Sequence, residues 1–268
     1  MTDSAMIQLS VEAGIATMTL NRPEKRNAFT DDMRTQLIET LEKVARDEEI
    51  RALIVTGAGK GFCAGGDVAG MERRMQAPTG DLAFAGWRRQ QRVHHAVTLL
   101  HSMPKPTIAA VNGAAAGLGA DLALSCDFVL ASNAASFTWS YIKRGLIPDG
   151  GGLYLLPRRV GLSRAKSLIF SGRRVEAGEA LSMGIADLVT SQELLLQDAH
   201  RWASEMSQGS PVALALGKTL LNRTFESDAE EVLMQGSQAQ AVCYTSAQHH
   251  ESVRDFLRQQ AERKGAAA

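Results

Sequence analysis

Two turns rich in glycine and alanine constrain the fold of this chain more than any other feature of its sequence. They span residues 62–68 (Phe-Cys-Ala-Gly-Gly-Asp-Val) and residues 112–121 (Asn-Gly-Ala-Ala-Ala-Gly-Leu-Gly-Ala-Asp). Each follows a strand-like segment and opens a helix-like one, where backbone N–H groups lack intrahelical acceptors. Either turn alone is typical of tight strand–helix packing. Two such turns facing each other would donate two hydrogen bonds to one oxygen atom, which is the arrangement of an oxyanion hole.

The segments around these turns predict a core in which strands and helices alternate. Thr30 is the expected N-cap of an amphipathic helix, and the polar, methionine-rich residues 71–79 are expected to form a mobile loop. Strand-like patterns occupy residues 7–11, 15–20, 52–56, 107–111 and 128–131.

The pattern changes after about residue 191, where the chain becomes almost wholly helical. Amphipathic stretches cover residues 194–206 and 211–222, and a longer one runs over 228–264. We therefore predict an α/β core over residues 1–195 and a helical C-terminal module over residues 196–268.

Composition excludes several classes of protein. The 29 basic and 29 acidic side chains give zero formal net charge, so no general attraction to nucleic acid or to an anionic membrane is expected. No apolar run reaches the length of a membrane span, and residues 1–14 lack the pattern of a leader peptide. The cysteines (Cys63, Cys126 and Cys243) are too few and too scattered for a disulfide framework or a zinc site. We expect a cytoplasmic protein without a metal.

Four motifs, taken together and in order, resemble the crotonase superfamily of enoyl-CoA hydratases, isomerases and their relatives. The resemblance runs from about Ile7 to about Leu257, and its last motif is closest to isomerases of the phenylacetyl-CoA type. The motifs lie at residues 20–28 (Leu-Asn-Arg-Pro-Glu-Lys-Arg-Asn-Ala), 56–67, 104–117 and 145–152 (Gly-Leu-Ile-Pro-Asp-Gly-Gly-Gly). Neither glycine-rich turn has the spacing of a dinucleotide fingerprint or a P-loop.

The resemblance implies a spiral of ββα units with a helical C-terminal trimerisation module, assembled as a homotrimer or a dimer of trimers. It implies an acyl-CoA thioester substrate, with coenzyme A as part of the substrate and no separate cofactor. The backbone N–H groups of Gly66 and Leu118 would form the oxyanion hole. Positions that match substrate- or CoA-contacting segments are Arg26, Ala28, Ala64, Asp67, Val68 and Ala114. For Asp67, a role as an acid at a helix N-terminus is at least as plausible.

Asp121 and Tyr141 occupy the positions at which the hydratases of this superfamily carry two glutamates. Asp121 is shorter by one methylene, and Tyr141 replaces a carboxylate with a phenol. A tyrosine with a pKa of about 10 cannot act as a ground-state base near neutral pH. Simple hydration of an enoyl-CoA is therefore disfavoured, although hydration that uses Asp121 stays open.

Asp149 lies where the resemblance places the catalytic aspartate of the isomerases. One carboxylate suffices to remove a proton α to a thioester and to return it at the γ carbon. We expect Leu146 and Ile147 to form an apolar wall that raises its pKa. Pro-Asp-Gly is also a common turn signal, and the residues alone favour a turn.

Two further alternatives stay open. Asp149 would be a nucleophile in a dehalogenase- or hydrolase-type acyl-CoA enzyme, for which His94 is the histidine at the matching place on the preceding helix. A non-catalytic binding protein with the same fold is the other alternative, and the zero net charge and Asp149 argue against it.

Overall fold

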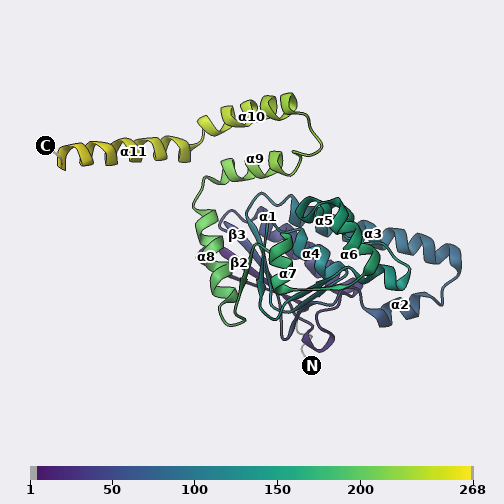
Figure 1. Ribbon diagram of the computed structural model, residues 1–268. Coiled ribbons are helices and arrows are strands. Elements are labelled where there is room, and N and C mark those ends of the chain that lie inside the picture. The colour runs from purple at the N-terminus through teal and green to yellow at the C-terminus, as the bar shows by residue number, and fades with distance from the viewer. Residues whose placement is uncertain (1–4, 267–268) are drawn as a thin grey trace. The chain divides into compact units, whose positions relative to one another are not determined.

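The computed structural model of the chain describes residues 5–266, and these divide into two compact units between residues 206 and 207. Figure 1 shows a first unit that mixes strands and helices and a second that is wholly helical, as predicted. The predicted boundary after residue 195 lies at the first residue of helix α8 (Leu195–Ser207), whereas the division between the units lies at its end.

The larger sheet of the first unit has six strands, in the order β1-β2-β3-β5-β7-β10. Among the described strands of this sheet, β1 pairs with β2 in an antiparallel arrangement and all other neighbours are parallel. Every residue of the central strands β3 and β5 is buried, as expected for parallel strands covered on both faces. The strands are β1 (Ile7–Glu12), β2 (Ile15–Leu20), β3 (Ala52–Gly57), β5 (Thr107–Val111), β7 (Phe128–Ser132) and β10 (Leu188–Thr190), which confirms the five predicted strand segments.

The smaller sheet carries the two glycine-rich turns. Its order is β4-β6-β8-β9, and β4, β6 and β8 are parallel. In three successive pairs along the chain, β3 and β4, β5 and β6, β7 and β8, the first strand joins the large sheet and the second joins the small one. Because β4 and β6 are parallel neighbours, both turns leave the sheet at the same edge. The strands are β4 (Gly61–Cys63), β6 (Ala114–Ala116), β8 (Ser136–Thr138) and β9 (Arg174–Glu176).

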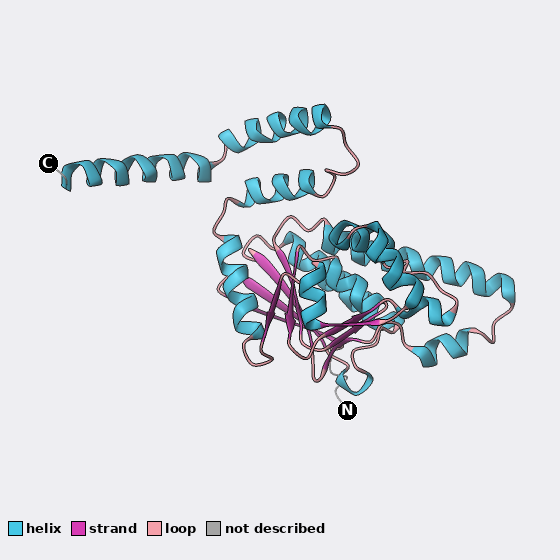
Figure 2. Ribbon diagram, viewed as in Figure 1, coloured by secondary structure: helices cyan, strands magenta, loops and turns pink. Residues whose placement is uncertain are grey.

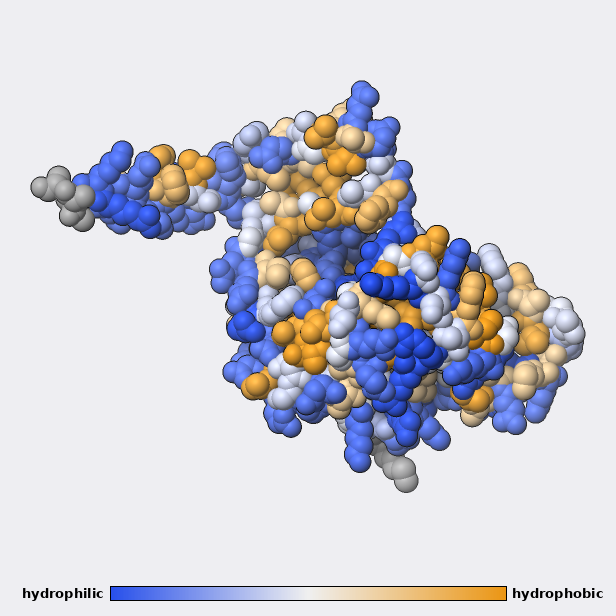
Figure 3. All heavy atoms as spheres, in the orientation of Figure 1, coloured by the Kyte–Doolittle hydropathy of each residue, from blue (hydrophilic) through white to orange (hydrophobic). Residues whose placement is uncertain are grey.

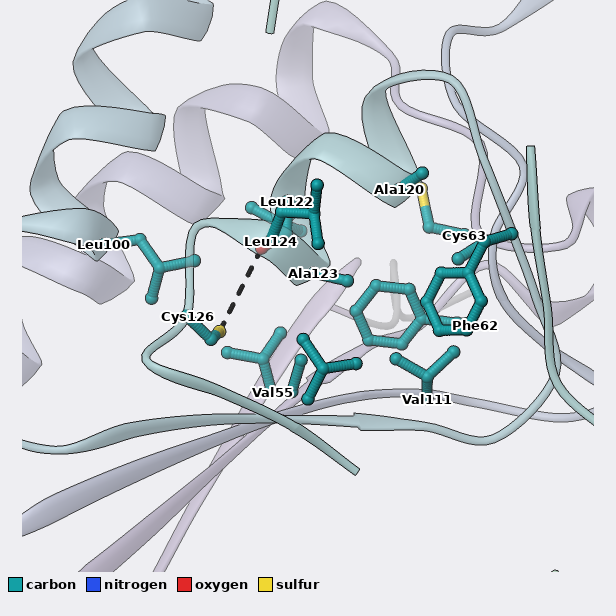
Figure 4. Close-up of a cluster of buried hydrophobic side chains, with 14 of the residues drawn as sticks. Val55, Phe62, Cys63, Leu100, Val111, Ala120, Leu122, Ala123, Leu124 and Cys126 are labelled. Carbon is teal, nitrogen blue, oxygen red and sulfur yellow. Dashed lines mark hydrogen bonds between the residues drawn. The ribbon is translucent and has the colours of Figure 1, made fainter. Parts of the chain in front are cut away.

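Helices surround the two sheets (Figure 2). The side chain of Thr30 accepts a hydrogen bond from Met33 N and caps the first long helix, as predicted. Figure 4 shows side chains of α4 lying over Val55 and Val111 of the large sheet, within one apolar core. The helices are η1 (Pro23–Lys25), α1 (Asp31–Arg46), α2 (Val68–Arg74), α3 (Thr79–His101), α4 (Leu118–Leu124), η2 (Ser140–Arg144), α5 (Gly152–Val160), α6 (Leu162–Ser171) and α7 (Ala177–Met183), followed by α8.

The loop expected at residues 71–79 is wrong in its first half, because α2 continues to Arg74. Asp67 supplies the capping interaction that starts this helix, since its side chain accepts a hydrogen bond from Gly70 N at 3.3 Å. Only residues 75–78 separate α2 from α3.

The second unit contains α9 (Pro211–Leu221), α10 (Ala229–Tyr244) and α11 (Ala247–Ala266). The single long helix expected over 228–264 is interrupted at Thr245 and Ser246. The hydroxyl of Ser246 donates to Cys243 O and accepts from His249 N, so it ends one helix and begins the next.

Large apolar side chains are exposed on these three helices and in the turn between α9 and α10, and Figure 3 shows apolar patches among polar ones in this unit. They include Leu221, Phe225, Leu233, Met234, Phe256 and Leu257. Within residues 5–266, no helix is both long enough and apolar enough to cross a membrane.

Candidate functional site

The two glycine-rich turns contact each other through their backbones. A Cβ atom on Gly65 would lie 2.7 Å from Ala116 O and 3.5 Å from Leu118 N. A Cβ atom on Gly119 would overlap the carbonyl oxygen of Cys63 and lie 2.7 Å from its Cβ. Gly65 and Gly117 also have positive φ angles, which glycine adopts without steric cost. Only turns without side chains at these points can approach so closely.

The predicted donors of the oxyanion hole lie on these turns. Leu118 is the first residue of α4, where the backbone N–H has no acceptor within the helix. Gly66 lies between two bonds to Phe29: Phe29 N donates to Gly65 O, and Asp67 N donates to Phe29 O. The two hydrogen bonds of this bridge use the carbonyl of Gly65 and the N–H of Asp67, and not the N–H of Gly66 itself.

The segment before α1 brings other predicted site residues to the first turn. Ala64 N donates to Arg26 O at 2.9 Å, and Arg26 has a left-handed backbone with φ of 48°. Arg26, Ala28 and Ala64 are therefore neighbours, whereas Ala114 lies on β6 at the base of the second turn.

Asn27 holds this segment in place, and sequence reasoning did not single it out. Its side chain is fully buried, and its φ of 58° is one that asparagine tolerates better than most residues. Its Nδ2 donates to the carbonyl oxygens of Ala58, Gly61 and Phe62, at 2.9–3.1 Å. The sequence feature that could have indicated this role is an asparagine in a turn that lacks glycine, since asparagine tolerates a positive φ.

Asp67 serves the helix that follows it. In addition to the bond from Gly70 N, its carboxylate lies 3.4 Å from Arg22 Nη1. Burial alone would raise the pKa of Asp67, but the bond from Gly70 and the charge of Arg22 hold it below the ordinary value. The helix-cap interpretation of Asp67 thus has a geometric basis, and Val68, the first residue of α2, is exposed.

Cys63 is a buried thiol. Its Sγ lies 3.2 Å from Asn27 O, and burial raises its pKa to about 12. At neutral pH it has almost no thiolate, so it is an unreactive core residue.

Asp149 lies beside the second turn. It is half-buried, and the residue after it, Gly150, packs against Leu118, whose Cδ1 would be 2.6 Å from a Cβ at that glycine. Burial raises the pKa of Asp149, opposed by its own backbone N–H and by the charges of His94 and Arg89 on α3. A carboxylate with a raised pKa is better matched to proton transfer near neutral pH.

The apolar wall expected from Leu146 and Ile147 is wrong, because both side chains are exposed. The apolar groups next to the Asp149 turn come from other elements. They are Leu118 of α4 against Gly150 and Val97 of α3 against Gly151.

Asp121 is fully buried and hydrogen-bonded at both oxygens. Trp139 Nε1 donates to its Oδ1 at 2.9 Å, and the Tyr141 hydroxyl donates to its Oδ2 at 2.6 Å. Burial raises the pKa of Asp121 to about 7; the hydrogen bonds oppose this rise, and the charge of Asp149 adds to it. Burial and the adjacent Asp121 also raise the pKa of Tyr141, so the phenol keeps its proton.

The raised pKa of Asp121 predicts a fold whose stability falls as the pH rises from about 4 to about 7. In this window the folded protein retains the proton and the unfolded chain has lost it. One pKa unit corresponds to about 1.4 kcal/mol, so a loss on the order of a few kcal/mol is expected. Urea unfolding of the wild type and of Asp121→Asn at about pH 4.5 and about pH 7.5 measures this loss, because the variant does not titrate at this position. Parallel changes in the two proteins would mean that Asp121 titrates with an ordinary pKa.

The fold and the site define a class: a crotonase-type α/β fold with two facing glycine-rich turns and a carboxylate beside them. The family model described as "Enoyl-CoA hydratase/isomerase" matches residues 10–265. The chain belongs to the enoyl-CoA hydratase/isomerase family, whose members act on acyl-CoA thioesters.

The individual relatives include an isomerase and a hydratase. The chain is 40% identical over 247 residues to the 1,2-epoxyphenylacetyl-CoA isomerase of Escherichia coli K12, covering 92% of this chain and 93% of the relative. It is 32% identical to the short-chain-enoyl-CoA hydratase of Clostridium acetobutylicum, covering 93% of each. The crystal structure of an enoyl-CoA hydratase/isomerase from Cupriavidus metallidurans CH34 superposes with a TM-score of 0.87 at 34% identity, covering 95% of this chain and 94% of that one.

Proposed function

We propose that the protein isomerises the double bond of an enoyl-CoA, with Asp149 as the acid and base. The carboxylate removes a proton from the α carbon of a 3-enoyl thioester. The N–H groups of Gly66 and Leu118 stabilise the enolate oxygen, and the protonated Asp149 then delivers the proton to the γ carbon. The double bond moves from the β,γ to the α,β position, and no cofactor is consumed. The observation that supports this proposal is that Gly150, the residue after Asp149, packs against the side chain of Leu118, whose backbone N–H is a proposed donor of the oxyanion hole.

The surroundings of Asp121 and Tyr141 argue against addition of water by this pair. Asp121 has no exposed surface and both its oxygens accept hydrogen bonds from indole and phenol groups. Tyr141 keeps its proton, so it cannot be the base that activates water. Hydratases among the relatives keep hydration as the second candidate.

Incubation with a 3-enoyl-CoA in heavy water distinguishes these reactions. An isomerase should shift the double bond into conjugation with the thioester and incorporate deuterium at the α or γ carbon, both of which mass spectrometry and absorbance detect. A hydratase should instead convert a 2-enoyl-CoA into a 3-hydroxyacyl-CoA, heavier by one water. Binding of CoA thioesters without either change would contradict the proposal.

We further propose that the path of the CoA moiety is lined by Arg26, Ala28, Ala64, Asp67, Val68 and Ala114, since all but Ala114 belong to or adjoin the first turn.

We also propose that the protein assembles as a homotrimer or a dimer of trimers. The exposed apolar side chains of the second unit support this assembly, because large exposed apolar patches commonly mark interfaces. A monomer in analytical ultracentrifugation would contradict the assembly.

A further inference from the structure

A single buried carboxylate contacts both ends of the segment that carries Asp149. At one end, Trp139 and Tyr141 donate to the two oxygens of Asp121. At the other end, the backbone N–H of Gly152 also donates to Asp121. We call these four groups (the Asp121 carboxylate, the Trp139 indole, the Tyr141 hydroxyl and the Gly152 N–H) the Asp121 anchor.

The contact at the second end is close enough to exclude any side chain. A Cβ atom on Gly152 would overlap Oδ1 of Asp121 and lie 3.1 Å from Pro148 Cβ. A Cβ atom on Gly150 would lie 2.8 Å from Oδ2. The carboxylate thus lies against the backbone after Asp149, which explains the glycines at positions 150 and 152.

Between the two ends, η2 packs against α6: a Cβ atom on Gly172 would lie 3.2 Å from Lys143 Cε and 3.3 Å from Ile142 Cγ2. Residues 142–147 are all exposed, and Trp139, before them, is fully buried. The turn that follows η2 takes its position from other contacts, which include those of Gly150 and Gly152 with Asp121. Three donors also offset the cost of burying a carboxylate, so loss of the carboxylate would leave the indole and the amide without their acceptor.

We propose that Asp121 is a positioning residue, which fixes the Asp149 turn against Leu118 and so holds the acid/base in reach of the substrate's α carbon. This proposal rests on the proposed function of Asp149. Asp121 contacts no substrate in this role, because its oxygens are buried and directed to Trp139, Tyr141 and Gly152. In this proposal Asp121, which occupies the position of a hydratase glutamate, affects the reaction only by positioning Asp149.

The test compares Asp121→Asn with a matched control on the same helix. Asparagine keeps the size of aspartate but replaces one acceptor oxygen with an NH₂ group. The Tyr141 hydroxyl must then turn to accept from this group instead of donating, and the negative charge is lost, which weakens the anchor. Tyr141→Phe removes one donor without a new buried polar group, and serves if Asp121→Asn folds poorly. The control is Ser125→Ala, which removes a buried hydrogen bond from the Ser125 hydroxyl to Asp121 O at 2.8 Å and leaves the carboxylate untouched.

Two readouts are needed, one of which does not depend on turnover. Hydrogen exchange of the substrate-free protein should show faster exchange at residues 150–152 in Asp121→Asn, by about tenfold or more, and not in Ser125→Ala. In isomerase assays Asp121→Asn should lower kcat by about 10- to 100-fold with KM within about twofold, because small displacements of a catalytic group have effects of this size. Tyr141→Phe should show smaller changes of the same kind.

The outcomes separate the two proposals. A fall in kcat with unchanged exchange at 150–152 would assign Asp121 a direct chemical role and overturn the positioning proposal. Unchanged exchange and unchanged kcat would overturn it as well. Faster exchange in a protein whose wild type shows no isomerase activity would support the anchor and reject the proposed function of Asp149.

Discussion

Replacement of Asp149 by asparagine is expected to lower the rate of double-bond isomerisation by about 10²- to 10⁴-fold, the range that a positioned acid/base contributes. Asparagine has nearly the same shape but cannot accept the α proton. Binding should stay nearly unchanged, because Asp149 is proposed to act on the acyl carbons and not on the CoA moiety. Steady-state absorbance gives kcat, and calorimetry with a saturated acyl-CoA gives the dissociation constant.

Asp121→Asn provides the comparison for this result. It should reduce turnover less than Asp149→Asn, since it displaces the base without removing it. If Asp121→Asn reduced turnover more than Asp149→Asn, hydration would be favoured over isomerisation. Urea denaturation of Asp149→Asn measures its free energy of unfolding. If this free energy falls so far that the variant unfolds, the lost activity would reflect unfolding and not the loss of an acid/base.

Replacement of Gly119 by alanine is expected to destabilise the fold by about 3 kcal/mol or more, the upper range for insertion of an atom into a packed interior. The new Cβ would overlap Cys63 O and lie 2.7 Å from Cys63 Cβ. The obstacle is largely backbone, so no flexible side chain can move aside. The two turns must separate, and the distance between the proposed donors Gly66 and Leu118 must change with them.

Gly178→Ala is the matched control for this effect. Gly178 is an exposed residue of α7, and nothing lies within 4 Å of a Cβ built on it. Alanine there should stabilise the protein by about 0.4–1 kcal/mol, because it restricts the unfolded chain without strain. Urea denaturation of both variants measures the contrast. Equal stabilities of Gly119→Ala and the wild type would show that the turns are not in tight contact.

The strands and the two turns could be predicted because local patterns determine them. Continuous apolar runs such as residues 52–55 mark parallel strands buried on both faces. Small residues after such strands mark close backbone approach. The helical C-terminal part of the chain could be predicted in the same way. The break between α10 and α11 at Ser246 could not, because it depends on hydrogen bonds of the Ser246 hydroxyl that compete locally with the helix.

The surroundings of the predicted site residues were harder to foresee, since they depend on contacts between distant segments. The motif at residues 145–152 predicts Asp149 as a site residue, yet the apolar groups beside its turn are Leu118 and Val97 and not its sequence neighbours. The bond from Trp139 to Asp121 joins residues 18 positions apart on different elements. Sequence periodicity carries no information on such pairings.

The parallel pairing of β4 with β6 also has a consequence for folding. Gly61 pairs with Ala114, so this contact closes a loop of roughly 50 residues, and such non-local pairing slows folding relative to local helix formation. The anchor adds partners from Trp139 and Gly152, later still in the chain. During synthesis, therefore, no nascent chain that ends before Gly152 contains all parts of the site, and helices such as α1 can form well before it.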